Sequence, residues 1–339
     1  MIESVDHRLN KNLESALGEY VLSALNDTIT TEIMLNPNGE LWLEQSGKPM
    51  FKAATLNTMQ GRLVVSLVAK ALHTTITRER PYVEGELPLD GSRFEGTDSP
   101  IVSGPSFCIR KKSKSVFPLG SYVENGIFSK KIHDFLIEAI TRRLNIIVIG
   151  GTGSGKTTLV NSIIAALARL NPDHRIVAME DTCELQVSSP NCVLFRTTDL
   201  INMQKLTMIS LRYRPDRIII GEVRDGSALD LLKAWNTGHD GGIATLHANN
   251  CQDSLGRLED LIAERVVSPM QRLIGRAVDV IVDIQKTDEG RKVVEVALVH
   301  GFDFDKKKYE MTYILKNKPS DGDKNWFLPF VADNVKDAA

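Results

Sequence analysis

The feature that most constrains this chain is the segment GGTGSGKT, which runs from Gly150 to Thr157. It matches G-x-x-x-x-G-K-[S/T] at every fixed position and follows the apolar run NIIVIGG, as a phosphate-binding loop follows a strand and opens a helix. Its glycines let successive backbone N–H groups point at a phosphate, and the helix start adds about half a positive charge. The segment therefore predicts a nucleotide site on an α/β fold.

The residues of this P-loop have separate expected roles. Lys156 is expected to reach the β- and γ-phosphates, and the Thr157 hydroxyl to coordinate Mg²⁺. We expect ATP and Mg²⁺ as cofactors. The predicted nucleotide-binding set is Gly151, Thr152, Gly153, Ser154, Gly155, Lys156, Thr157 and Thr158.

Two acidic clusters follow other apolar runs. The first, VAMEDTCE, contains Glu180, Asp181 and Glu184, and the second, DRIIIGEVRD, contains Glu222. Because ligands of α/β folds bind at the carboxyl ends of parallel strands, both clusters should lie at the edge that holds Thr157. One would position water and the other would hold Mg²⁺, directly or through water. For Glu184 a solvated loop position remains an alternative.

Two histidines flank a further apolar run in WNTGHDGGIATLHANN, residues 235–250. The run, 243–246, predicts a buried core strand, with His239 before it and His247 after it. We expect both histidines near the nucleotide edge, as γ-phosphate sensors or as links between the acidic clusters and their surroundings. Purely structural hydrogen bonding is the alternative. A zinc site is disfavoured, because no cysteine or acid lies at a spacing that would complete four ligands.

The hydrophobic patterns divide the chain into parts. Residues 1–112 combine two amphipathic helices, 7–25 and 55–76, with a hairpin at Asn-Pro-Asn-Gly, and predict a smaller α+β domain. Residues 113–128 are expected to be an interdomain linker. Residues 129–339 alternate continuous apolar runs with helical segments, which predicts a P-loop (RecA-like) domain with a mainly parallel sheet covered on both faces.

Bulk properties exclude several classes of protein. A net charge of −2 over 339 residues gives no strong sign of direct nucleic-acid binding. The sequence contains neither an apolar stretch of about 18 residues nor a signal peptide. The four cysteines form no CxxC pair and are interpreted as reduced thiols of a cytosolic protein, with zinc binding as the alternative. Two roles for the basic segment 109–114, IRKKSK, stay open: contact with anionic lipid and a solvated linker.

These motifs together resemble the secretion-ATPase superfamily, the hexameric motors of type II and type IV secretion, type IV pili and conjugation. The family has a Walker A loop, an acidic Asp box, a Walker B segment with glutamate, and a His box T-G-H-x-G-x-x-x-T-x-H, which Thr237–His247 matches throughout. These motifs cover at least residues 130–265.

The N-terminal segments EIMLNPNGELWLE, VEGELPLDGSRFEG and SFCIRKK resemble conjugal-transfer ATPases of the type IV secretion branch. The resemblance thus extends over most of the chain. The short N-terminal region and the lack of a tetracysteine zinc module favour this branch over the type II and pilus assembly ATPases.

The resemblance implies roles for individual residues. Glu180 corresponds to the Asp-box glutamate that positions water, and Glu222 to the Walker B glutamate near Mg²⁺. Arg93 and Arg110 are the candidates for arginines that close over the nucleotide from the N-terminal domain, where a guanidinium can bind phosphate bidentately. Arginine fingers from a neighbouring subunit are sought among three residues of LRYRPDR: Arg212, Arg214 and Arg217.

The resemblance also implies a function. The chain is expected to be a homohexameric cytoplasmic ATPase, peripherally associated with the inner membrane and working with inner-membrane components of a secretion or conjugation channel. Nucleotide would lie between the two domains, and hydrolysis would change their angle around the linker. Three alternatives stay open: a type IV pilus retraction motor, a nucleic-acid-translocating ring, and a nucleotide-gated scaffold without turnover.

Overall fold

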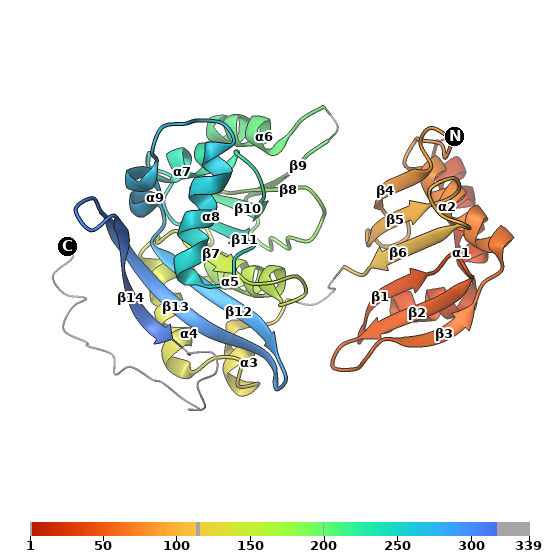
Figure 1. Cartoon of the computed structure of the whole chain (residues 1–339), viewed down its shortest axis with the longest axis horizontal. Coiled ribbons are helices and arrows are strands. Elements are labelled where there is room, and N and C mark those ends of the chain that lie inside the picture. Colours follow the sequence, from red (N-terminus) through yellow and green to blue (C-terminus); the bar gives the residue numbers. More distant parts are fainter. Residues whose placement is uncertain (1, 113–115, 199, 317–339) are drawn as a thin grey trace. The chain divides into compact units, whose positions relative to one another are not determined.

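The computed structural model describes residues 2–112, 116–198 and 200–316, and the chain divides into two compact units, Met1–Lys114 and Ser115–Ala339 (Figure 1). The predicted extension of the P-loop domain through residues 317–339 lies outside the described residues, as do linker residues 113–115. Among the described residues, no helix has the length and apolar character needed to cross a membrane.

The first unit is a six-stranded antiparallel sheet with two helices packed on one face (Figure 1). Its strand order is β3-β2-β1-β6-β5-β4. Alternate strand residues such as Ile33, Phe94 and Ile109 are fully buried against the helices, which is the period of two expected for a half-covered sheet. The elements are α1 (Ile2–Asn26), β1 (Thr30–Leu35), β2 (Glu40–Gln45), β3 (Phe51–Thr55), α2 (Thr58–Ala71), β4 (Tyr82–Glu86), β5 (Arg93–Thr97) and β6 (Ser106–Arg110).

The second unit is built on an eight-stranded sheet in the order β14-β13-β12-β7-β11-β10-β8-β9. Strands β12 to β9 in this order are parallel, and β13 and β14 add antiparallel neighbours at one side. The strands are β7 (Ile146–Ile149), β8 (Ile176–Glu180), β9 (Cys192–Arg196), β10 (Arg217–Val223), β11 (Ile243–Leu246), β12 (Val280–Thr287), β13 (Gly290–Asp303) and β14 (Lys308–Lys316).

Helices cover both faces of this sheet (Figure 1). On β7, Ile146 and Val148 face the layer of α3 (Leu119–Glu124), α4 (Lys130–Thr141) and α5 (Lys156–Leu170). Ile147 and Ile149 face the other layer, which contains α6 (Met203–Ser210), α7 (Ala228–Trp235), α8 (Cys251–Ala263) and α9 (Gln271–Ala277). This alternation is the period of two of a strand that is buried on both faces. The predicted fold class, a P-loop domain with a mainly parallel sheet after a smaller α+β unit, is confirmed.

Two predicted segments differ from the structure. Residues 119–124, inside the predicted linker, form α3, whose Leu119 and Tyr122 are buried in the core of the second unit. Composition alone suggested a linker, whereas these two apolar side chains tie the segment to the P-loop unit. Residues 129–339 were predicted to form a sheet covered on both faces, but their apolar run NCVLFRT forms the edge strand β9, and Leu194 there is 46% exposed.

Candidate nucleotide site

The P-loop connects β7 to α5, as its sequence predicts. Gly155 is the N-cap of α5 and has a φ of 100°, a left-handed conformation that favours glycine. At Gly150 a Cβ atom would lie 2.1 Å from the carbonyl oxygen of Ile284 on β12, so no side chain fits there. Glycine is therefore favoured at Gly155 by the backbone conformation and required at Gly150 by the lack of space for a Cβ atom.

Lys156 is the first residue of α5, and its side chain turns back over the P-loop. Its Nζ donates hydrogen bonds of 2.9 Å to the carbonyl oxygens of Gly150 and Gly151. The same atom lies 3.4 Å from each ring nitrogen of His247. The residue is only 8% exposed, so its charge is held in a largely enclosed position at the sheet edge.

His247 connects Lys156 to the Walker B glutamate. Its Nε2 is 3.1 Å from Oε1 of Glu222, which lies on β10. An ammonium group only donates hydrogen bonds and a carboxylate only accepts them. A neutral imidazole that donates from Nε2 to Glu222 and accepts at Nδ1 from Lys156 satisfies both neighbours. The structure thus brings three predicted site residues together.

Two glutamates of the acidic loop after β8 accept different hydrogen bonds. Glu180 is 2% exposed, and its Oε2 accepts 2.8 Å hydrogen bonds from the backbone N–H groups of Glu184 and Leu185. The Glu184 carboxylate instead accepts a 3.1 Å hydrogen bond from the Thr157 hydroxyl. Glu184, for which the sequence left a solvated position open, is therefore the carboxylate beside the predicted metal ligand, and Glu180 anchors its loop.

The sequence motifs did not predict Arg224 as a site residue, although it belongs to the Walker B segment GEVRD. It follows β10 directly, and its Nη2 lies 2.6 Å from Oε2 of Glu222. Its Nη1 lies 3.4 Å from Oδ2 of Asp181, which follows β8. The available signal was its position two residues after Glu222, which puts both side chains on one side of an extended segment.

The prediction that both histidines lie at the nucleotide edge is wrong for His239. Strand β11 runs parallel to β7, and His247 follows its carboxyl end, whereas His239 precedes its amino end. The Nδ1 atom of His239 lies 3.2 Å from the carbonyl oxygen of Pro215, which precedes β10. A four-residue strand spans about 13 Å. The two histidines therefore lie at opposite ends of the parallel strands, although their spacing in the sequence suggested one site.

The structure also separates the three arginines of LRYRPDR. Arg217 is 1% exposed, and it donates hydrogen bonds to the carbonyl oxygens of Ile140 and Gly241. Burial lowers the pKa of its guanidinium to about 10. Such a side chain cannot reach a neighbouring subunit, so Arg217 is excluded as an arginine finger. Arg212 and Arg214 are exposed.

Arg93 and Arg110 lie in the first unit, opposite each other on β5 and β6. Both alternate with buried residues and therefore lie on the sheet face away from the helices. The Nε of Arg110 is 3.5 Å from Oε1 of Glu32. Like charges at directly opposite positions are unfavourable in a sheet, and Glu32 supplies a counter-charge to Arg110. Their role as a nucleotide clamp stays a prediction.

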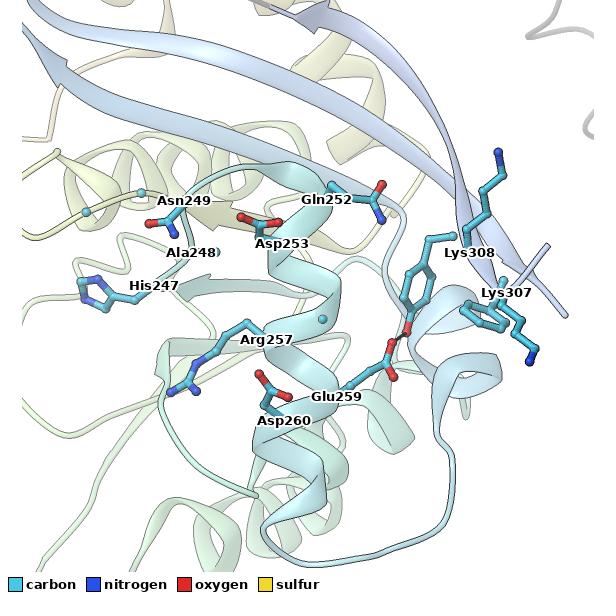
Figure 2. Close-up of a pocket in the computed structure, with 15 residues that line it drawn as sticks. His247, Ala248, Asn249, Gln252, Asp253, Arg257, Glu259, Asp260, Lys307 and Lys308 are labelled. Carbon is cyan, nitrogen blue, oxygen red and sulfur yellow. Dashed lines mark hydrogen bonds between the residues drawn. The ribbon is translucent and has the colours of Figure 1, made fainter. Parts of the chain in front are cut away.

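A cavity of about 680 Å³ adjoins the P-loop (Figure 2). Gly150, Gly151 and His247 line one part, and α8 together with the neighbouring ends of β13 and β14 lines the rest. Figure 2 shows Asp253, Arg257 and other charged residues along α8. The cavity therefore has charged side chains along α8 and reaches Gly150, Gly151 and His247, which contact Lys156. In the described part of the chain, no group of three His, Cys, Asp or Glu residues is placed to hold a metal by itself.

Comparison with known proteins agrees with these features. The model of the family described as "Type II/IV secretion system protein" matches residues 18–295. The probable conjugal transfer protein TrbB of Sinorhizobium fredii (strain NBRC 101917 / NGR234) is 45% identical over 295 residues, covering 87% of this chain and 91% of that protein. The conjugal transfer protein TrbB of Rhizobium radiobacter is 46% identical with the same coverage.

Solved structures of similar fold include the Legionella pneumophila ATPase DotB, with a TM-score of 0.58 and 20% identity over 80% of this chain and 76% of that one. The pilus retraction motor PilT with bound ADP has a TM-score of 0.59 and 19% identity, over 88% of this chain and 82% of that one. At these identities the similarity concerns the fold alone.

Proposed function

This chain belongs to the type II/IV secretion system protein family, and we propose that it hydrolyses ATP to drive conjugal transfer through a type IV secretion apparatus. Family membership and a complete P-loop make it a nucleotide-binding ATPase. The observation that carries the proposal is the contact of His247 with both Lys156 and Glu222. The names of its relatives, conjugal transfer proteins, direct the proposal to conjugation.

The P-loop would bind the phosphates of ATP. Its backbone N–H groups lie just before α5 and in its first turn, where the helix N-terminus favours negative charge. Lys156 would exchange its present acceptors, the carbonyl oxygens of Gly150 and Gly151, for oxygens of the β- and γ-phosphates. That exchange would also change its contact with His247.

The donor set at the site fits Mg²⁺. The Thr157 hydroxyl and the carboxylates of Glu184 and Glu222 are hard oxygen ligands, and Mg²⁺ is usually held by one or two carboxylates together with phosphates and water. Thr157 and Glu184 would lie closest to the ion, and Glu222 would act directly or through water. When bound, the ion would neutralise charge on the phosphates.

Side chains of this unit would supply the remaining catalytic groups. Glu184 would accept a hydrogen bond from the attacking water and so orient it, while Glu180 would hold the loop that presents Glu184. Lys156 would stabilise the charge that develops on the γ-phosphate oxygens. His247 would couple the position of Lys156 to that of Glu222.

We further propose that the active form is a homohexamer. A ring built from one repeated head-to-tail interface needs two different faces of each subunit. The exposed Arg212 and Arg214 are candidates to reach a neighbouring site, and Arg93 and Arg110 would clamp the nucleotide from an N-terminal unit. Nucleotide binding would then change the angle between the two units. The ring would work at the cytoplasmic side of the inner membrane, docked on membrane components of the channel.

A transfer assay tests the conjugation role. A donor strain that lacks its own related protein is supplied with this chain or with Lys156→Ala. We expect the wild-type chain to restore plasmid transfer and the variant to fail, with exposed Lys130→Ala as the matched control. Restored pilus retraction without restored transfer would refute the conjugation assignment and favour a retraction motor.

The ring is tested separately by specific ATPase activity against protein concentration. A steep rise to a plateau is expected if a neighbouring subunit completes the site. A flat profile together with a monomer mass in light scattering would contradict the ring proposal.

A further inference from the structure

Arg224 joins acidic groups at the carboxyl ends of two different strands. Its two terminal nitrogens contact Glu222 at 2.6 Å and Asp181 at 3.4 Å. Glu222 lies on β10 and Asp181 directly follows β8, and these strands are parallel neighbours. One guanidinium therefore links the carboxyl ends of adjacent strands at the edge where the P-loop also lies.

Arg224 and His247 contact different oxygens of the same carboxylate. Oε2 of Glu222 faces Arg224, and Oε1 faces His247 at 3.1 Å. The Glu222 carboxylate is thereby held from both sides, which fixes its orientation as well as its position. A planar guanidinium can serve two carboxylates at once with a defined geometry, and a lysine ammonium is a single point charge.

The charges around Arg224 give a second reason for its presence. Its hydrogen bond to Glu222 raises the pKa of the guanidinium, and the nearby charges of Glu222, Asp181 and Glu184 act in the same direction. Without Arg224, Glu222 and Asp181 would lose their shared counter-charge and would repel each other.

Stability alone does not account for this arrangement. The side chains of Arg224 and Asp181 are 47% and 34% exposed. Ion pairs with this exposure contribute little to the stability of a protein. The positions of the partners of Arg224 matter for hydrolysis instead. Glu222 lies beside His247, and Asp181 begins the loop that presents Glu184.

We infer that Arg224 is a positioning residue for hydrolysis, which holds the Glu222 carboxylate toward His247 and fixes the 181–184 loop beside the P-loop. This inference rests on the proposed ATPase function. Arg224 would act through Glu222 and Asp181, and it would contribute little to the binding of nucleotide, which depends on the P-loop.

The test compares steady-state ATP hydrolysis by the full chain with Arg224→Ala, Arg224→Lys and Arg142→Ala. Arg142 is the matched control, since its Nε makes a 2.5 Å exposed ion pair with Glu138 in the same unit. We expect Arg224→Ala to lower kcat about 10- to 100-fold, the range for partners that orient active-site ligands, with KM for ATP changed less than about 3-fold. Arg224→Lys should recover part of kcat, and Arg142→Ala should match the wild type.

Several results would overturn the inference. One is a kcat for Arg224→Ala equal to that of Arg142→Ala; another is a lowered kcat accompanied by a matching loss of thermal stability. If the alanine variant does not fold, a normal kcat for Arg224→Lys overturns it. Absence of turnover in the wild type would refute the proposed function and this inference with it, whereas failure of the inference alone leaves wild-type activity intact.

Discussion

Asp283 is the clearest case in which this fold tolerates an unfavourable charge. It lies on β12, opposite Glu295 on β13, and it is fully buried one residue before Ile284, whose carbonyl packs on the P-loop. Gln285 donates a 2.8 Å hydrogen bond to its Oδ2. Burial raises the pKa of Asp283 from 3.8 to about 7; the Gln285 hydrogen bond opposes this shift and Glu295 adds to it.

The raised pKa sets the sign of a pH dependence. Between pH 3.8 and about 7, folded Asp283 keeps a proton that the unfolded chain has lost, so the free energy of unfolding falls as pH rises and is constant above that range. The difference between the two pKa values corresponds to about 4 kcal/mol, at about 1.36 kcal/mol per pH unit. Integrated between pH 5 and pH 8, the loss is about 2.5 kcal/mol.

Asp283→Asn should remove this dependence. The amide oxygen can still accept the Gln285 hydrogen bond, and no charge has to be buried at high pH. Calorimetric unfolding at pH 5 and pH 8, with the two units fitted as separate transitions, should show the variant gaining about 2.5 kcal/mol over the wild type between these pH values. Exposed Asp288→Asn, in the turn between β12 and β13, is the control. Equal pH dependence in the wild type and Asp283→Asn would show that the folded chain does not raise the pKa of Asp283.

Three further outcomes follow from particular contacts. Glu184→Gln should lower kcat about 10- to 100-fold while ADP binding is retained; wild-type phosphate release by the variant would contradict the role given to Glu184. Asn145→Ala should destabilise the second unit by about 2–4 kcal/mol in calorimetry, because the Asn145 Oδ1 accepts hydrogen bonds from the backbone N–H groups of Gly241 and Gly242; an unchanged transition would argue against it. Arg110→Ala should weaken nucleotide binding about 10-fold in a fluorescence titration, and unchanged affinity would remove this arginine from the clamp.

The P-loop could be predicted in full from the sequence, because its residues are adjacent and their spacing is fixed by backbone geometry. The same holds for β7, β8 and β10, whose continuous apolar runs match buried parallel strands. Strand β9 shows the limit of this signal, since its run is equally apolar but lies at a sheet edge. The order of the strands depends on contacts between distant segments, so a local sequence pattern does not predict it.

The site residues show the same division. His247 and Glu222 lie at or just after the carboxyl ends of their strands, so their common edge could be predicted. His239 was misplaced because the spacing between the two histidines includes a whole strand. The contact of Glu184 with Thr157 could not be predicted, since the fold of the loop is set by hydrogen bonds from Glu184 and Leu185 to the Glu180 carboxylate.

The Lys156 site is proposed to hydrolyse ATP. The most direct measurement is Mg²⁺-dependent phosphate release from ATP by the purified full chain, beside Lys156→Ala at the same protein concentration. We expect turnover by the wild type and a loss of about 100-fold or more in the variant, since Lys156 supplies charge to both bound phosphates and the transition state. Equal phosphate release by the two proteins would contradict it.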